Sequence, residues 1–404
     1  MAVKKRKGIP QETLLLIKSA SVFILIFGII PLTSFLIWFF MPSAVLNVVV
    51  LDKTVPNESA QEHQAIHWSL NHLKYLKEDG KPYDVSTDYF GYFPGYSADE
   101  GKVVDFNQLS QSDKSMLLDK SSMVYYADTY GVYENDFIDD PDDYRSEKIY
   151  GGMDQADVDF LEEALKREKY VIAEFNTMAS PTPIDIRNQV EELVGIKWTG
   201  WITRYFDELD TLINDELPRW MIEAYIDQHE GQWDFKGSGQ VFLHERGRLE
   251  ILESGVDISK DVPSIMSDVN NQRRFGIPEI VKYPYWIDVV LVSRDYDVIS
   301  YFEISPTESG INKLRDMGLP RFFPAAVSKK VGENGRFFYF SGDFADMRLN
   351  NTSHRFYALA RLYRLFLHAE DYSQPSSFFW NYYYPLFKTI LADASKNVEV
   401  IKPD

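Results

Sequence analysis

Apolar and polar positions switch between strand-like and helix-like periods along most of the chain. Residues 44–52 form an almost unbroken apolar run, which is typical of a strand covered on both faces of a parallel sheet. Behind the capping residues 57–59, apolar positions recur at i, i+4 and i+7 from Ile66 to Leu73, which is a helical period. Strands and helices then alternate, which predicts βαβ units and a doubly wound, mostly parallel sheet. Further strands are expected at 83–90, 122–133 and 170–174, and helices at 154–168 and 185–194.

The second half of the chain adds predicted hairpins and helices to this sheet. One hairpin is expected to turn at Arg246-Gly247 and another at Asn334-Gly335, a strong short-range hairpin signal. A strand pair is predicted within 286–304, and helices at 217–230, 354–369 and 375–394. The chain is thus expected to comprise a basic N-terminus (1–18), a transmembrane helix (19–41), an α/β domain (44–260) and a continuation that completes the sheet and ends in two helices (261–404).

The segment 19–41 contains no charged residue and follows a basic start, Lys4, Lys5, Arg6, Lys7 and Lys18. At about 1.5 Å per residue it would form a helix of roughly 34 Å, enough to cross a bilayer core of about 30 Å, and Pro31 predicts a kink in it. A cleaved signal peptide is the alternative, but its apolar region is shorter and ends in a small-x-small site. The positive-inside rule places the N-terminus in the cytoplasm, so we expect a single-pass protein whose main domain lies outside.

The remainder of the chain is strongly acidic. The protein has 42 basic and 61 acidic residues, of which residues 1–41 hold five and one, so the rest carries 37 against 60, or −23. A field of this sign disfavours nucleic acid and anionic lipid as partners. The chain has no cysteine, which fits a bacterial envelope better than a eukaryotic cell surface. No cofactor is implied.

Carboxylates end several of the predicted parallel strands, where open α/β sheets bind ligands. They are Asp52, Asp128, Glu174, Asp343 and Asp346. Two carboxylates that flank a sugar bond can serve as acid and as nucleophile or base, so Glu174 and Asp128, supported by Asp343, are candidate catalytic residues. Asp52, Tyr130 and Asn176 belong to the same predicted loops and are candidate binding residues. The alternative is that Asp and Asn after strands form turns and helix caps.

Two further polar clusters resemble metal sites only in part. His63 and His67 are four residues apart on a predicted helix, but the segment lacks the catalytic Glu of a H-E-x-x-H motif, and a solvated helix face is the prediction. Residues 134–147 include six acidic side chains within 134–143, without the spacing of an EF-hand loop, which predicts an exposed acidic loop. No metal site is predicted.

Aromatic residues make up 15% of the chain, with 25 Tyr and 27 Phe. Trp198 and Trp201 flank Gly200 in a predicted loop next to Arg204, and these three side chains are candidate binding residues. Sugars present apolar faces that stack on aromatic rings, so an aromatic cleft rimmed by carboxylates would suit a neutral or cationic polysaccharide. The continuous run at 378–387 is expected to pack in the core or at an interface.

The order strand, helix, strand, strand, helix, strand, turn resembles the class I glutamine amidotransferase-like fold, a flavodoxin-like superfamily, over residues 44–260 with a return at 321–346. In amidotransferases a nucleophilic Cys lies in a G-x-C-x-G elbow, and on residues 173–177 its position is taken by Phe175, which cannot attack a carbonyl. The family's second signature, His-x-Glu, falls on 339–346, where Asp343 stands near the His position. The resemblance therefore implies a degenerate member that lacks the Cys/His dyad.

Two functions of different class follow as expectations. The first is a membrane-anchored, extracytoplasmic binding or scaffolding domain, catalytically silent, that works with a polysaccharide synthesis or export system and takes a polysaccharide ligand or a membrane-protein partner. The second is an extracytoplasmic glycan hydrolase that uses the carboxylate pair. Carboxyls about 5 to 9.5 Å apart in a sugar-sized cleft would favour the hydrolase. Carboxyls buried against backbone amides would favour the binding domain.

Overall fold

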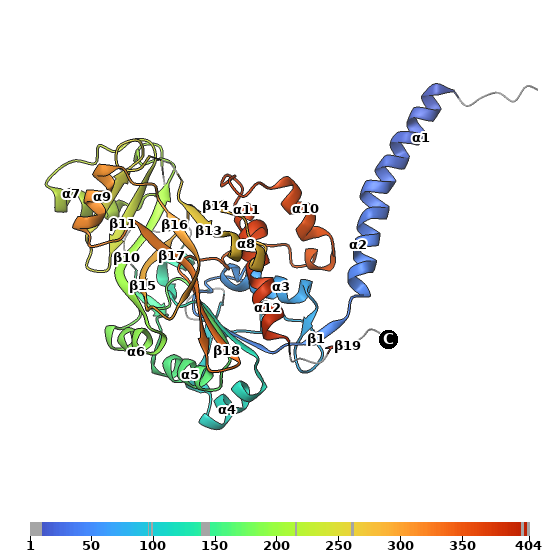
Figure 1. The fold of residues 1–404 in the computed structure, drawn as a ribbon, viewed down its shortest axis with the longest axis horizontal. Helices are drawn as coiled ribbons and strands as arrows, with labels where there is room; N and C mark the ends of the chain where they lie inside the picture. The colour runs from blue at the N-terminus through green and yellow to red at the C-terminus, as the bar shows by residue number, and fades with distance from the viewer. Residues whose placement is uncertain are drawn as a thin grey trace, which may run out of the picture.

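A ten-stranded mixed sheet runs through the folded part of the protein (Figure 1). The computed structural model describes residues 10–95, 97, 100–138, 146–214, 216–259, 262–396 and 400–401. Across the sheet the strands are β14 (Ile280–Lys282), β13 (Ser264–Ser267), β16 (Asp297–Glu303), β17 (Phe322–Val331), β18 (Gly335–Phe340), β9 (Tyr170–Ala173), β6 (Met123–Asp128), β2 (Val48–Asp52), β4 (Phe90–Phe93) and β5 (Lys102–Val104).

The centre of this sheet is parallel and its margins are antiparallel. Strands β18, β9, β6, β2 and β4 are parallel neighbours. Strands β13, β14, β16 and β17 extend one side in antiparallel pairs, and β5 closes the other side against β4. The strands that follow residue 261 therefore join the sheet that the first half begins, and the predicted return at 321–346 supplies its fifth parallel strand.

Helices cover both faces of the parallel centre. Val48 and Val50 of β2 belong to a core shared with α3 (Gln61–His72) and α12 (Tyr384–Ala394), whereas Val49 and Leu51 belong to a second core shared with α5 (Gln155–Lys166) and α6 (Ile184–Val194). Successive side chains of a strand point to opposite faces, so a strand between two helical layers must be apolar at every position. The burial of both faces of β2 therefore explains the unbroken run of apolar residues from which this strand was predicted.

A second sheet of four strands packs beside the first and has its own core. Its order is β12 (Leu249–Glu253), β11 (Gly239–His244), β10 (Ile196–Phe206) and β15 (Ile287–Val292), and α7 (Arg219–His229) covers it. The hairpin predicted at Arg246-Gly247 joins β11 to β12, as expected. The predicted strand pair within 286–304 is wrong: β15 pairs with β10, and β16 pairs with β13 and β17. The turn between β15 and β16 carries the chain from one sheet to the other, which the alternation of residues does not reveal.

Two further predictions need correction. Of the strand predicted at 83–90 only Phe90 is extended, and residues 83–89 form a loop. Asn71 holds this loop at Tyr83: its amide nitrogen donates to the carbonyl of Tyr83 at 2.8 Å, and its amide oxygen accepts from the backbone N–H of Tyr83 at 2.9 Å. The helix predicted at 354–369 is limited to α10 (Leu359–Phe366). The last predicted helix is confirmed as α11 (Ser376–Phe378), the π-helical segment η6 (Phe379–Tyr383) and α12 in succession.

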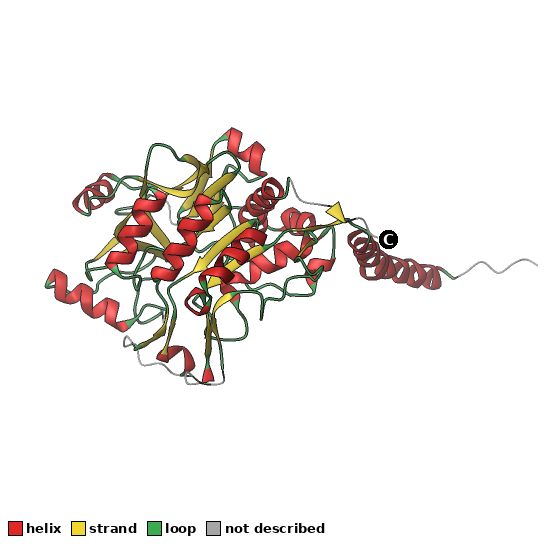
Figure 2. Cartoon of the chain, turned by 90° about the horizontal axis from the view of Figure 1, so that it is seen from below, coloured by secondary structure: helices red, strands yellow, loops and turns green. Residues whose placement is uncertain are grey.

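The N-terminal helix projects away from the folded part (Figures 1 and 2). It consists of α1 (Gln11–Ile24), the π-helical segment η1 (Leu25–Ile29) and α2 (Ile30–Phe39). Pro31 cannot donate a backbone hydrogen bond and would clash with the preceding turn, which accounts for the wider π turn just before it. This helix of 29 residues has a hydropathy of 2.5 and is long and apolar enough to cross a membrane. Its last turns contact the folded part, since the indole of Trp38 donates to the carbonyl of His72 at 3.1 Å.

A buried lysine ties the end of β2 to the start of α5. Lys53 is 1% exposed, and its ammonium lies 2.6 Å from Asp157, 3.1 Å from Asp154 and 3.0 Å from the carbonyl of Gly152. Burial raises the pKa of Asp157 to about 6, although the ammonium opposes that shift. Asp154 also caps α5 by accepting from the backbone N–H of Ala156. One cation thus holds a strand end against a helix start.

We predict that Lys53→Met lowers the free energy of unfolding by about 3 to 5 kcal/mol, because it leaves Asp157 buried without its counter-charge. Urea unfolding of the full chain in detergent micelles measures this loss. The matched control is Lys120→Met, since Lys120 pairs with Glu78 at 2.9 Å with both side chains more than half exposed. The control is expected to cost less than about 1 kcal/mol. Equal losses in the two variants would contradict the role assigned to Lys53.

Candidate functional site

The carboxyl ends of the parallel strands carry the acidic cluster that the sequence predicts. Asp52 and Asp128 end β2 and β6 and are partners in the ladder, and Glu174 follows β9 directly. Asp343 and Asp346 come after β18, which lies next to β9. The charges of these groups act on one another, since Asp346, Asp128 and Glu174 all raise the pKa of Asp343. Five carboxyls therefore gather at the edge of the sheet where open α/β folds bind ligands.

Glu174 is fully buried and holds the loop after β18. Its Oε2 accepts hydrogen bonds from the backbone N–H groups of Phe344 at 2.9 Å and Ala345 at 3.1 Å. Its Oε1 accepts from the hydroxyl of Tyr125, which lies 3.0 Å from the hydroxyl of Tyr383 on η6. Burial raises the pKa of Glu174 to about 8, so the carboxyl is mostly neutral at pH 7. A side chain in this position links three segments and does not reach solvent.

The turn after β9 places Asn176, and not Phe175, in the left-handed region. Asn176 has a φ of 67°, a conformation that Asn tolerates better than most residues. Its backbone N–H donates to Asp288 Oδ2 at 3.2 Å, and its amide nitrogen lies 3.4 Å from both oxygens of Asp128. Phe175 is buried, at 5% exposure. A sharp turn therefore follows β9, and Asn176 occupies its left-handed position.

Asp128 accepts a second hydrogen bond, from the backbone N–H of Tyr130 at 2.6 Å. Burial and the charge of Asp52 raise the pKa of Asp128 to about 7, against the effect of this N–H. The side chain of Tyr130 is 44% exposed, and its ring lies 4.9 Å from that of Tyr133. Asp128 thus forms the turn after β6, while Tyr130 is at the surface beside it.

The prediction that His63 and His67 lie on a solvated helix face is wrong, because both side chains are buried at 2% exposure or less. His63 Nδ1 bonds Asp52 Oδ2 at 2.6 Å, and its Nε2 donates to the carbonyl of Val85 at 2.8 Å. Both ring nitrogens are therefore engaged in hydrogen bonds, and neither is free for a metal. The loop 83–89 covers this helix face, and the sequence of α3 alone does not indicate that another segment covers it.

The predicted loop around Gly200 is also wrong. Trp198 and Trp201 belong to β10, which runs between β11 and β15 with a bulge between Trp198 and Ile202. They are 5% and 3% exposed and serve as core residues. Arg204, on the same strand, is partly exposed and lies 2.6 Å from Glu216. Of these three candidate binding residues, only Arg204 reaches a cavity.

That cavity, of about 580 Å³, opens beside the acidic cluster and has the size of a small-ligand site. Its walls come from β10, the segment before β15, the loop after β18 and the start of the C-terminal helix. They combine carboxyls, cations and aromatic rings: Gln61, Arg204, Tyr285, Trp286, Asp343, Phe344, Asp346, Met347, Arg348, Pro375, Ser376, Phe378 and Phe379. The guanidinium of Arg204 lies 6.0 Å from the ring of Trp286. The loop that Glu174 holds therefore forms one wall of the cavity.

The carboxyls at this wall have unusual protonation. Burial, together with the charge of Asp346, raises the pKa of Asp343 well above its ordinary value, and burial also raises that of Asp346. Nearby, burial and the charges of Asp52 and Asp346 raise the pKa of Glu62 to about 9. Asp346 Oδ1 is buried without a hydrogen-bond partner among the described residues. The wall thus offers two carboxyl groups whose ionisation is disfavoured, and the buried Oδ1 of Asp346 has no partner among the described residues.

The lining residues that sequence reasoning missed include Tyr285, Trp286 and Phe379, and it also missed Glu62, which follows the lining residue Gln61. The run from Tyr283 to Trp286 contains three aromatic residues and was a usable signal, as dense as the one around Gly200. Glu62 could not be distinguished from other helical acids, because its raised pKa comes from burial and then from the charges of carboxyls on β2, β6 and the loop after β18.

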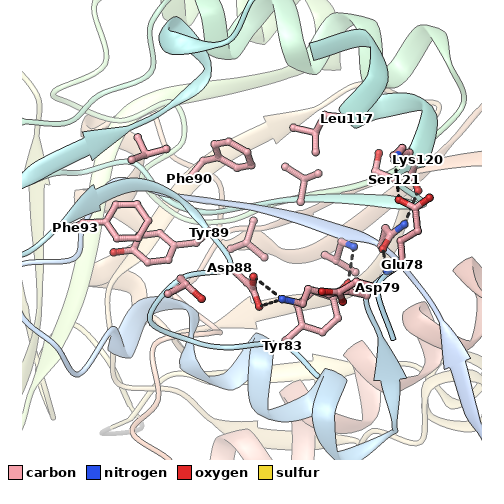
Figure 3. A pocket seen from close by; sticks show the side chains of 17 residues that line it. Glu78, Asp79, Tyr83, Asp88, Tyr89, Phe90, Phe93, Leu117, Lys120 and Ser121 are labelled. Carbon is pink, nitrogen blue, oxygen red and sulfur yellow. Dashed lines mark hydrogen bonds and ion pairs between the residues drawn. The ribbon is translucent and has the colours of Figure 1, made fainter. Parts of the chain in front are cut away.

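A second cavity, of about 480 Å³, lies at the opposite end of β2 (Figure 3). Val48, Val49 and Val50 form its floor, and Tyr83 and Phe90 are in its walls. Ion pairs at its rim, Lys77 with Asp88 at 2.8 Å and Lys120 with Glu78 at 2.9 Å, already satisfy the charged groups there. We therefore assign the candidate site to the cavity beside Asp343, where Asp346 Oδ1 has no hydrogen-bond partner among the described residues.

No group of three or more His, Asp or Glu residues that could hold a metal occurs in the described parts of the chain. The predicted acidic loop at 134–147 is described only in part, since residues 139–145 lie outside the described residues. Within it Asp136 accepts from the backbone N–H of Tyr133 at 2.8 Å and so forms a local turn.

No protein-family model and no curated protein matches the chain. Among solved structures, a ThuA-like protein from Bacteroides uniformis is similar over 82% of this chain and 96% of its own, at 9% identity and a TM-score of 0.33. A cytoplasmic protein from Salmonella typhimurium is similar over 86% and 98%, at 10% identity and a TM-score of 0.35. A catalytic mutant of a family GH42 β-galactosidase from G. stearothermophilus is similar over 80% and 30%, at 9% identity and a TM-score of 0.27. Likenesses this low carry no argument about function.

We predict that Glu174→Gln flattens the dependence of stability on pH. A buried acid whose pKa is raised from 4.5 to about 8 binds a proton when folded and releases it when unfolded, so stability falls as pH rises through this window. Between about pH 6 and pH 8 this group alone lowers the unfolding free energy of the wild type by about 2 kcal/mol. The amide of Gln stays neutral and can keep the bonds to Tyr125 and to the loop.

Urea midpoints of the full chain at these pH values measure the effect. The control, Glu162→Gln, changes an exposed acid paired with Lys166 and is expected to keep the wild-type slope. Asp128 and Asp288 have pKa values raised to about 7 and act in the same direction, so some slope remains in the Glu174→Gln variant. Identical slopes in the wild type and Glu174→Gln would show that the carboxyl is not held neutral.

Proposed function

We propose that the protein is a membrane-anchored, extracytoplasmic binding domain that holds a neutral or cationic glycan in the cavity beside Asp343, as part of a system that makes or exports envelope polysaccharide. The observation that carries the proposal is the composition of that cavity. Trp286, Tyr285 and Phe378 supply rings on which the apolar face of a sugar can stack. Asp343 and Asp346 supply carboxyl groups for its hydroxyls.

The state of the other carboxyls supports binding in preference to hydrolysis. Glu174 is closed from solvent and bonded to two backbone amides, Asp128 is bonded to the N–H of Tyr130, and Asp52 is bonded to His63 and to the N–H of Thr54. Carboxyls with these hydrogen bonds stabilise turns and connect segments of the fold. A carboxyl that attacks or protonates a sugar must instead reach the scissile bond.

The strand order supports the finer description of the fold. Numbered in chain order, the parallel strands β2, β4, β6, β9 and β18 lie in the spatial order 2-1-3-4-5, which is the order of flavodoxin-like doubly wound sheets. We propose that the domain is a degenerate amidotransferase-like member of this class. Buried Phe175 and left-handed Asn176 at the turn after β9 are consistent with a lost nucleophile.

The N-terminal helix supports anchoring. The basic residues before it favour an N-terminus in the cytoplasm and a main domain outside. We propose that the part that crosses the membrane lies N-terminal to the predicted bounds 19–41, because Ser34 and Trp38 contact the folded part. From Gln11 to Thr33 the helix is almost entirely exposed, with Glu12 and Lys18 in its first turns, and 23 residues at about 1.5 Å each give roughly 34 Å, enough for a bilayer core. We propose that the chain keeps this helix as an anchor and does not lose it as a signal sequence.

A glycan hydrolase is the second candidate, and one observation favours it. Burial, with the charge of Asp346, raises the pKa of Asp343 on the wall of an open cavity, and a raised pKa favours the protonated form that a general acid requires. In this mechanism Asp343 donates the proton to the leaving oxygen, and Asp346, which lines the same cavity, is the carboxyl that could assist.

The test is binding of the full chain in nanodiscs to an array of bacterial envelope glycans, with product analysis on every glycan that binds. We predict that Trp286→Ala weakens binding at least about tenfold, or about 1.4 kcal/mol, because it removes a stacking surface. The control is Tyr301→Ala, which removes an aromatic side chain 43% exposed on β16 and outside the cavity. Tyr301→Ala is expected to bind as the wild type does.

Asp343→Asn separates the two candidates. The amide keeps the size and much of the hydrogen bonding of the neutral acid but cannot transfer a proton, so a binding domain should retain affinity in this variant. Turnover in the wild type that disappears in Asp343→Asn would establish the hydrolase. Equal affinity of Trp286→Ala and the wild type, or no bound glycan on the array, would overturn the assignment of this cavity.

A further inference from the structure

The helix α10 exposes an apolar surface next to the proposed membrane anchor. One side of α10 packs on the folded part, where Tyr363 stacks on Trp380 with ring centroids 4.6 Å apart and Ala360 is buried. Its apolar arc continues beyond this contact, and Leu362, Leu365 and Phe366 are 50%, 76% and 73% exposed. An exposed cluster of this kind on a monomer usually marks an interaction surface.

Direct contacts place this surface beside the anchor. The backbone N–H of Tyr357 donates to the carbonyl of Ser34 at 3.3 Å, and that of Ala358 donates to the hydroxyl of Ser34 at 3.1 Å. Both residues immediately precede α10, and Figure 1 shows α10 and α2 on the same side of the domain. If the helix before Ser34 crosses the bilayer, α10 begins at the depth where that helix leaves the lipid.

The charges around α10 differ from those of the rest of the chain. Residues 348–369 contain four arginines and neither Asp nor Glu, whereas 61 acidic residues in 404 would place about three in a segment of this length. Arg361 and Arg364 are exposed, and Arg364 donates a hydrogen bond to the carbonyl of Gly276 at 3.0 Å. Burial, and then the charges of these two arginines, lower the pKa of Lys388. No ion pair of either arginine is found within the described residues. A cationic, apolar helix is suited to an interface that holds acyl chains and anionic headgroups.

We propose that α10 is a second membrane contact, which inserts Leu362, Leu365 and Phe366 among the lipids beside the anchor and places Arg361 and Arg364 at anionic headgroups. The inference rests on the proposed anchoring. We propose lipid as the partner of the exposed face of α10, since the anchor already brings a bilayer to this side of the domain. The chain as a whole has a negative net charge, but the local charge at this face is positive.

The absence of cysteine from the chain allows a direct test by single-site labelling. Leu365→Cys, Phe27→Cys in the anchor and Ile184→Cys on α6 each receive an environment-sensitive fluorophore, and the full chain is placed in phosphatidylcholine nanodiscs with phosphatidylglycerol. Ile184 and Phe27 are both 66% exposed, so the three sites start from similar exposure. Lipids with a nitroxide high on the acyl chain then report contact by quenching.

We expect the nitroxide to quench the labels at 365 and 27 several-fold more strongly than the label at 184. Quenching at 27 without quenching at 365 would overturn the proposal and leave the anchor intact, and would mean that water or a protein partner covers α10. Absence of quenching at both positions would overturn the anchor and, with it, the contact of α10.

The charges are tested by adding Arg361→Glu to the Leu365→Cys chain. Arg361 makes no hydrogen bond among the described residues, and its guanidinium lies 5.9 Å from the ring of Tyr357. We therefore expect the change to leave the fold intact. Quenching at 365 is expected to fall in discs with phosphatidylglycerol and to stay constant in discs of phosphatidylcholine alone. An equal response in the two kinds of disc would overturn the role of anionic headgroups.

Discussion

Removal of the Glu174 carboxyl from water is the constraint on which the acidic edge of the sheet depends. The group takes hydrogen bonds from β6 through Tyr125 and from the loop after β18 through two backbone amides, and it can be buried there because it is mostly neutral. A buried polar group stabilises a fold only when its partners are present. Glu174 therefore fixes where the chain travels after β18, and so fixes Asp343 and Asp346 at the cavity.

The same constraint separates two kinds of carboxyl at this edge. Asp52, Asp128 and Glu174 are inside, each bonded to backbone or to a neighbouring side chain. Asp343 and Asp346 lie farther out and line an open cavity with aromatic and cationic neighbours. Some carboxyls of the cluster thus stabilise the fold, and others are available to contact a ligand. This division accounts for the presence of so many acids at one edge without a metal ligand set among the described residues.

The sequence was sufficient for features that depend on local pattern. The apolar run of β2, the helical period of α3 and the Asn-Gly turn between β17 and β18 all appear near their predicted places. The sequence was insufficient where a segment distant in the chain determines whether a residue is buried. Trp198 and Trp201 are core because β11 and β15 flank β10, and His63 is buried because the loop 83–89 covers it. The cavity could not be predicted because its walls come from segments separated by more than 300 positions, from Gln61 to Phe379.

The position of β18 has a consequence for how the chain acquires this fold. β18 lies between β9 and β17 in the middle of the large sheet, yet Gly335 follows Tyr170 by 165 positions. While the protein is synthesised, β9 must therefore wait with one edge unpaired until most of the chain has been made. Contacts this distant in sequence form slowly, and open strand edges favour aggregation. A chain delivered from its N-terminus would need its apolar edge protected throughout that interval, by a chaperone or by its own early helices.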